Sequence, residues 1–137
     1  MSISLAGYYI TEIDNWKDTL DFLIGEIEST ENRLYEVSHY NNLPGLVSKI
    51  GLHLQNLQIS RVKFEEIDNS LALLEKRILV KNKPVDNKFI TQSFINSQRE
   101  MRNKIFSVEK EYLEIKYNCD FFIAQTLLQQ NKIKHEI

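Results

Sequence analysis

The sequence predicts an all-α fold, an elongated antiparallel up-down-up three-helix bundle with coiled-coil-like packing. Apolar residues recur in steps of three and four along most of the chain, which is the period of one helix face. Only four glycines and two prolines supply turns among 137 residues, so a few long elements are expected. The prolines stand in two polar interruptions of the apolar pattern, which places helices at about 4–41, 44–81 and 86–132.

The first helix carries its stripe at Trp16, Leu20, Leu23, Ile27, Thr30, Leu34 and Val37. The same step runs backwards to Ala6, so we expect the helix to begin near Ser4, although Gly7 costs about 1 kcal/mol inside a helix. In the alternative, Asp14 is the N-cap and residues 1–12 form an arm.

The second and third helices follow breaks at Asn41–Gly45 and Lys81–Asp86. Asp86 or Asn87 is the expected N-cap of the third helix, and residues 130–137 are expected to fray. The stripe of the second helix includes Leu46, Ile50, His53, Leu57, Ser60, Phe64, Ile67, Leu71, Leu74 and Ile78. That of the third includes Phe94, Gln98, Met101, Ile105, Val108, Tyr112, Ile115, Cys119, Phe122 and Thr126.

Short connections make consecutive helices antiparallel neighbours within a single domain of residues 1–137. Folding the chain back at the two breaks brings Thr30, His53 and Tyr112 to one level. We therefore expect these residues to form a buried polar layer that fixes the register of the helices.

The composition is that of a globular protein, with 42% hydrophobic and 26% charged residues. A net charge of −2 makes nucleic acid an unlikely partner for the chain as a whole. No glycine-rich phosphate loop or nucleophile motif occurs, so we expect neither an enzyme nor a cofactor. The single cysteine, Cys119, fits a core position in a cytoplasmic protein, with no histidine expected at its level. No secretory signal and no membrane span are expected.

Glu36 and His39 form an E-x-x-H, the spacing that diiron bundles use on facing helices. A diiron site needs a second such motif, which the sequence lacks. The neighbouring stripe residues Leu34 and Val37 direct this pair toward solvent, so a surface pair is expected. A metal-binding, diiron-like bundle is the alternative.

Several aromatic residues do not fit one buried seam. Phe22, Phe106 and Phe121 lie off the stripes, and Phe122 lies where the third helix extends beyond the others. These residues either fill grooves between helices or form an interaction surface for a protein partner or a second copy, as in a homodimer. A basic tip at residues 76–88, with Lys81, Lys83 and the adjacent Phe89, is a candidate nucleic-acid site.

The pattern Trp16-x3-Leu20-x-Phe22-x3-Glu26, followed by Glu31-Asn32-Arg33-Leu34-x-Glu36-Val37, resembles the opening helix of uncharacterised small helical-bundle proteins of Bacteroidota-type bacteria. The resemblance covers about a quarter of the chain. It implies a bacterial helical bundle and transfers no activity and no functional residue. The function expected from the whole sequence is a non-enzymatic interaction, scaffold or chaperone-like role, in which helix surfaces bind a protein partner.

Overall fold

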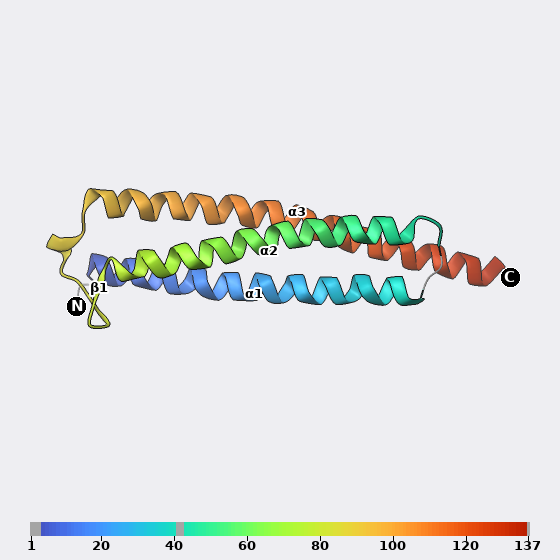
Figure 1. The fold of residues 1–137 in the computed structure, drawn as a ribbon, viewed down its shortest axis with the longest axis horizontal. Helices are drawn as coiled ribbons and strands as arrows, with labels where there is room; N and C mark the ends of the chain where they lie inside the picture. The colour runs from blue at the N-terminus through green and yellow to red at the C-terminus, as the bar shows by residue number, and fades with distance from the viewer. Residues whose placement is uncertain (1–3, 41–42, 137) are drawn as a thin grey trace. The chain divides into compact units, whose positions relative to one another are not determined.

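The computed structural model describes residues 4–40 and 43–136, and it confirms the all-α three-helix bundle. Helix α1 spans Leu5–Tyr40, α2 spans Leu46–Lys76 and α3 spans Gln92–Glu136 (Figure 1). Between α2 and α3 lie two short strands, β1 (Leu79–Val80) and β2 (Lys83–Pro84), and a 3-10 helix, η1 (Asn87–Phe89). Side-chain contacts join α1 to α2, α2 to α3, and α1 to α3.

The chain divides into two compact units. Unit 1 comprises Met1–Leu23 and Lys63–Val108, and unit 2 comprises Ile24–Val62 and Glu109–Ile137. Each of the three helices contributes one stretch to each unit. Each unit therefore has its own three-helix core, built from different residues of the same three helices.

The core of unit 1 is apolar with one polar layer. Its largest fully buried side chains include Phe64 and Ile67 from α2 and Gln98 from α3. Gln98 Nε2 donates to Glu12 Oε1 at 2.8 Å, and Arg102 donates to both oxygens of the same carboxylate at 2.7 and 2.9 Å. These three hydrogen bonds give the Glu12 carboxylate donors close to the core, where an unpaired carboxylate would lower stability.

The core of unit 2 combines apolar residues with buried hydroxyl and thiol groups. Ile27, Leu34 and Leu57 are fully buried there, together with Tyr112 and Cys119. Two arginine–carboxylate pairs bracket this core, Arg61 with Glu31 between α1 and α2, and Arg33 with Asp120 between α1 and α3. The exposed Arg33–Asp120 pair adds little stability by itself, but both pairs restrict which helix levels can meet.

The predicted stripes are confirmed as the inward-facing positions of all three helices. Every stripe residue named above is buried or half-buried. The α1–α3 contacts join residues separated by 86 to 90 positions in both units, as expected for two helices that run parallel in one register.

The early start of α1 is confirmed, since the helix begins at Leu5 rather than at Asp14. Ser4 acts as the N-cap, because its Oγ accepts a hydrogen bond from the Gly7 backbone N–H at 3.0 Å. The Leu5 N–H donates to Asn87 Oδ1 at 2.9 Å, so η1 satisfies a second donor of the first turn. The part of the expected arm at residues 1–3 lies outside the described residues.

The predicted end of the second helix near 81 is wrong, because α2 ends at Lys76 and a β-hairpin follows. Lys81 and Asn82 have φ values of 51° and 64°, so the two-residue turn has the left-handed backbone of a type I′ hairpin. The Val85 N–H donates to the Ile78 carbonyl at 2.9 Å and closes the hairpin behind the strands. Asparagine tolerates this backbone well, whereas lysine gives no sequence signal for it.

The predicted N-cap of the third helix is also wrong, since α3 begins at Gln92 and Thr91 caps it. The Phe94 N–H donates to Thr91 Oγ1 at 3.1 Å. Asp86 instead precedes η1 and makes no side-chain capping bond. The helix continues to Glu136, beyond the expected end near 132.

Candidate interaction surfaces

The exposed side of α3 in unit 2 carries a second apolar stripe. Leu113, Tyr117, Phe121, Ala124 and Leu128 follow one another in steps of four, four, three and four, and all are exposed. Tyr117 and Phe121 stack with ring centroids 6.4 Å apart and planes 13° from parallel. We call these five residues the outer α3 face. Steps of three and four place these residues on one side of the helix, and the buried stripe of α3 has the same spacing.

The opposite side of α3 in unit 2 packs into the core through Tyr112, Cys119, Ile123 and Thr126. The helix is therefore apolar on two opposite sides, of which one has no cover among the described residues. Lys110, Glu114 and Asn118 flank the outer α3 face and line a shallow hollow with Leu113 and Tyr117. An apolar strip with a polar rim is the usual anatomy of a protein-binding surface.

The aromatic candidates from the sequence fall into two groups. Phe22, Phe89 and Phe106 are exposed in unit 1, and Phe121 is exposed in unit 2. Phe122 differs, because it is half-buried and its ring lies 4.6 Å from the His53 ring. The structure thus makes Phe122 a packing residue of unit 2 and leaves the other four on the surface.

The predicted polar layer of Thr30, His53 and Tyr112 does not form as one cluster. Thr30 and Tyr112 are buried, but the Tyr112 hydroxyl donates to Glu26 Oε1 at 3.1 Å. His53 is half-buried, and its described contacts are with Cys119 and Phe122. Both pairings of α2 differ from the expected ones. Glu31, next to Thr30, pairs with Arg61 of α2 instead of lying at the level of His53, and His53 meets Cys119 of α3 instead of Tyr112.

The Tyr112–Glu26 contact is reinforced by Lys116, whose Nζ lies 3.4 Å from Glu26 Oε1. Burial and the neighbouring Glu26 carboxylate raise the pKa of Tyr112 well above its usual value of 10.0. The tyrosine therefore stays neutral, and its hydroxyl donates a hydrogen bond to the Glu26 carboxylate.

Contrary to expectation, a histidine lies at the level of Cys119, with the Sγ atom 3.7 Å from His53 Nδ1. Burial raises the pKa of the Cys119 thiol to about 11 and lowers the pKa of His53 below its usual 6.5. Both groups are thus neutral near pH 7, and Cys119 is fully buried. A thiolate–imidazolium pair of the kind that cysteine nucleophiles use is disfavoured at this site.

Glu36 and His39 are both exposed on α1. His39 lies in the last turn of the helix. The diiron alternative needs these side chains to point inward, which they do not. In the part of the chain that the structure describes, no group of three or more His, Cys, Asp and Glu side chains could hold a metal ion.

The basic tip of the sequence is the hairpin region of unit 1. Lys81 and Lys83 are exposed, and Lys88 Nζ lies 5.2 Å from the centre of the exposed Phe89 ring. The acid nearest in sequence on α2, Glu75, is paired with Lys17 of α1. The pairing raises the pKa of Lys17, chiefly through its hydrogen bond to Glu75.

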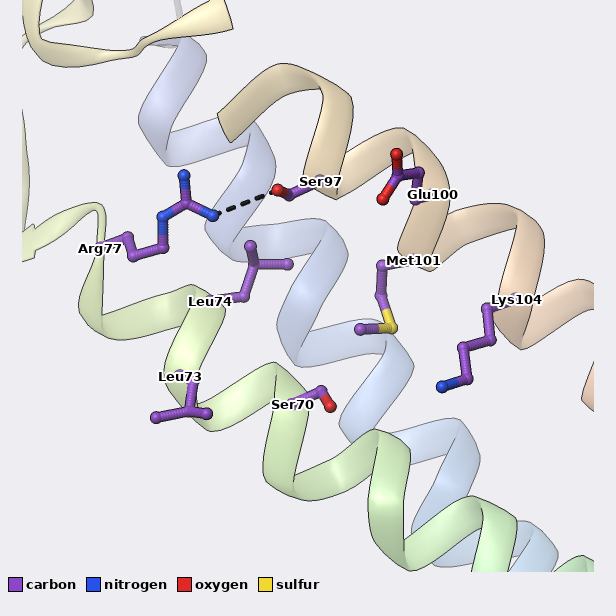
Figure 2. Close-up of a pocket in the computed structure, with 8 residues that line it drawn as sticks. All are labelled: Ser70, Leu73, Leu74, Arg77, Ser97, Glu100, Met101 and Lys104. Carbon is purple, nitrogen blue, oxygen red and sulfur yellow. Dashed lines mark hydrogen bonds between the residues drawn. The ribbon is translucent and has the colours of Figure 1, made fainter. Parts of the chain in front are cut away.

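A groove between α2 and α3 lies in unit 1 and was not predicted from the sequence. Its volume is about 350 Å³. Figure 2 shows Arg77 reaching toward Ser97, while Leu74 and Met101 point into the space between the helices. The lining residues are Ser70, Leu73, Leu74, Arg77, Ser97, Glu100, Met101 and Lys104. Sequence reasoning missed the groove because it depends on the register of α2 against α3.

Comparison with protein-family models, with curated proteins and with solved structures found no match to the chain. The resemblance of the first helix to Bacteroidota-type bundle proteins stays a prediction. Within the described residues, no helix combines the length and apolar character that crossing a bilayer requires.

Proposed function

We propose that the protein is a non-enzymatic helical scaffold that binds a protein partner through the outer α3 face. The observation that carries this proposal is the second apolar stripe on a helix whose first stripe is already buried. Tyr117, Phe121 and Leu128 are 68%, 54% and 64% exposed. Scattered exposed apolar residues are ordinary on a protein surface, whereas a continuous stripe with two stacked rings is characteristic of a binding surface.

The shape of this surface favours a helical partner. The outer α3 face is narrow, straight along the helix and spaced in steps of three and four, so a second amphipathic helix can place its own apolar residues between these side chains. Tyrosine and phenylalanine supply large contact area with little rotamer entropy to lose. Lys110 and Glu114 at the rim present charges of both signs, which a partner helix can meet with complementary charges.

The partner is another protein or, in the simplest case, a second copy of this chain that presents the same face. A C2 dimer would pair the stripe with itself, which the self-complementary apolar character of the stripe permits. We further propose a cytoplasmic location, supported by the single buried cysteine, since disulfides are rare in reducing compartments.

The proposal is tested by photo-crosslinking in cells that make the protein naturally. Phe121 is replaced by the photoreactive amino acid p-benzoylphenylalanine, and Tyr35, an exposed aromatic residue of α1 in unit 2, is replaced in a matched control. We expect a discrete crosslinked product of fixed mass from position 121 and none of that mass from position 35. Mass spectrometry of the product tells a second copy from a different protein.

The double substitution Tyr117→Ser with Phe121→Ser provides the complementary test. It removes both rings from an exposed surface, so the free energy of unfolding should change by less than about 1 kcal/mol, whereas the association should be lost. Because residue 121 is serine in this variant, the photoreactive amino acid is placed at position 124 to detect the association. Equal crosslinking from positions 121 and 35, or association that survives the double substitution, would contradict the proposal.

The hairpin supports a second candidate function, binding of nucleic acid through Lys81, Lys83 and Phe89. The favouring observation is that Glu75 and Glu12, two acids of the same unit, are paired with Lys17 and Arg102. Binding to DNA or RNA should then weaken steeply with added salt and fall further in a Lys81→Gln, Lys83→Gln variant. The absence of any salt-sensitive binding would exclude this function.

A further inference from the structure

We propose that the groove between α2 and α3 in unit 1 binds a small amphiphilic carboxylate. In this arrangement Arg77 receives the carboxylate, and Leu74 and Met101 contact its apolar chain (Figure 2). This inference goes beyond the binding of a protein partner and concerns a different unit, so either proposal can hold without the other.

The guanidinium of Arg77 is held in place but is not neutralised. Its carbon lies 5.2 Å from the centre of the Phe94 ring, and NH1 donates to Ser97 Oγ at 3.2 Å. The Ser97 hydroxyl donates its own proton to the Ser93 carbonyl at 3.0 Å, so it can only accept from Arg77. A ring and a hydroxyl thus fix the orientation of the guanidinium without cancelling its charge.

Arg77 differs in this respect from three other arginines. Arg33, Arg61 and Arg102 each pair with a carboxylate of a neighbouring helix. No carboxylate pairs with Arg77 among the residues that the structure describes. A fixed guanidinium has the planar pair of donors that a carboxylate matches, so its open side is a ready anion acceptor.

The rest of the groove favours an apolar chain behind that anion. Leu74 is buried beneath the groove, Met101 is half-buried, and Leu73 is exposed along the edge. Methionine adapts its shape to an incoming apolar group, which suits it to contact a flexible alkyl chain. A volume of about 350 Å³ falls within the range of small-molecule sites, which is roughly 300–1,000 Å³.

The charges at the groove favour a singly charged anion over a phosphate. Lys104 and Arg77 are opposed by one lining carboxylate, Glu100. A dianion would meet repulsion from Glu100 and would leave the apolar lining uncovered. A monocarboxylate with an alkyl chain satisfies the guanidinium and covers Leu74 and Met101 together.

Met101 makes the proposal directly testable, because the chain contains only two methionines. In protein labelled with ¹³C at the methionine methyl groups, the signal of Met101 reports on the groove, and an inert standard added to the sample serves as the reference. The probes are hexanoate, hexylammonium and hexanol at matched ionic strength. We expect hexanoate to shift the Met101 signal saturably, with weaker binding of hexanol and no binding of hexylammonium.

Two substitutions separate the site from the general charge of the protein. Arg77→Gln should raise the Kd for hexanoate by about tenfold or more, because a charge-assisted pair is lost. Arg99→Gln removes the same charge from an exposed position of α3 that does not line the groove, and should change the Kd by less than about twofold. Arg77 is itself exposed, so its substitution should leave the fold intact.

Three results would overturn the proposal. One is the absence of a saturable Met101 shift with hexanoate. Another is equal binding of hexanoate and hexylammonium, which would show that the groove does not select a carboxylate. The third is equal weakening by the Arg77→Gln and Arg99→Gln variants, which would indicate attraction by overall charge instead of a site at Arg77.

Discussion

The side-chain amide of Gln98 donates a hydrogen bond to Glu12 Oε1 at 2.8 Å, although Gln98 is fully buried in the core of unit 1. Arg102 holds the same carboxylate from the solvent side with two hydrogen bonds. The contact ties one level of α1 to one level of α3. A slip of either helix by one turn would leave a buried amide and a carboxylate without these partners, which is how polar layers specify register.

Glu12→Ala should destabilise the protein by about 1–3 kcal/mol, because it removes the main acceptor of a buried amide donor. Urea denaturation followed by circular dichroism measures the change. Asp18→Ala, which removes an exposed acid from the same helix, is the matched control and should stay within about 0.5 kcal/mol of the parent. Equal effects of the two substitutions would mean that the Gln98–Glu12 contact does not stabilise unit 1.

Cys119 should make the protein sensitive to alkali. Burial raises the pKa of its thiol from 9.0 to about 11, so the unfolded chain releases this proton at lower pH than the folded chain does. Stability is then retained below pH 9 and falls between about pH 9 and 11, by roughly 1–3 kcal/mol. The raised pKa of Tyr112 acts in the same direction at higher pH.

A Cys119→Ala variant should lose the part of the pH dependence between 9 and 11, whatever its stability at neutral pH. Ile123→Val, a neighbouring core substitution in unit 2, should lower stability and keep the slope of the parent. Denaturation midpoints measured across this pH range make the comparison. Identical slopes for the parent and Cys119→Ala would contradict the buried, protonated thiol.

His53→Leu should leave the free energy of unfolding at pH 7 unchanged or increase it. The histidine is half-buried against Cys119 and Phe122, and its weak contact with sulfur is replaced by apolar packing. Burial lowers the pKa of His53 below 6.5, so the parent should lose stability as the pH falls below that value, and the variant should lose less. A cost of several kcal/mol at pH 7 would show that His53 holds a larger hydrogen-bond network.

Lys81→Asn should stabilise the protein by about 0.5–1 kcal/mol, since asparagine tolerates a positive φ better than lysine does. Lys83→Asn provides the control, because Lys83 lies in β2 and is not among the residues with positive φ. Thermal unfolding of both variants against the parent tests the turn. A gain from Lys83→Asn alone would argue against the type I′ backbone at Lys81 and Asn82.

The inward-facing residues of all three helices could be predicted from the sequence, because the 3-4 period depends only on local geometry. Ile27, Phe64 and Val108 illustrate this, since each was assigned to a stripe and each is buried. The start of α1 near Ser4 could also be predicted, because the 3-4 spacing of apolar residues continues back to the first residues of the chain.

The level at which residues of different helices meet could not be predicted, because it depends on the length and shape of the connections. The Lys81–Asn82 turn contains no glycine, so the second helix was predicted to continue through β1 to about residue 81, and the level of His53 was misplaced. The groove at Arg77 depends on the same register. The outer α3 face was seen only in part, through Phe121, because Leu113, Tyr117 and Leu128 were not recognised as one stripe.

Solvent protection of the outer α3 face tests the central claim most directly. Ala124→Cys places a thiol in the middle of this face, and Ser29→Cys places one on the exposed side of α1 in unit 2, both in a Cys119→Ala background. In dilute purified protein both thiols should react rapidly with a membrane-permeable maleimide. In cells that make the protein naturally, we expect the thiol at 124 to be protected and the thiol at 29 to remain reactive. Equal labelling of both positions in cells would contradict the account.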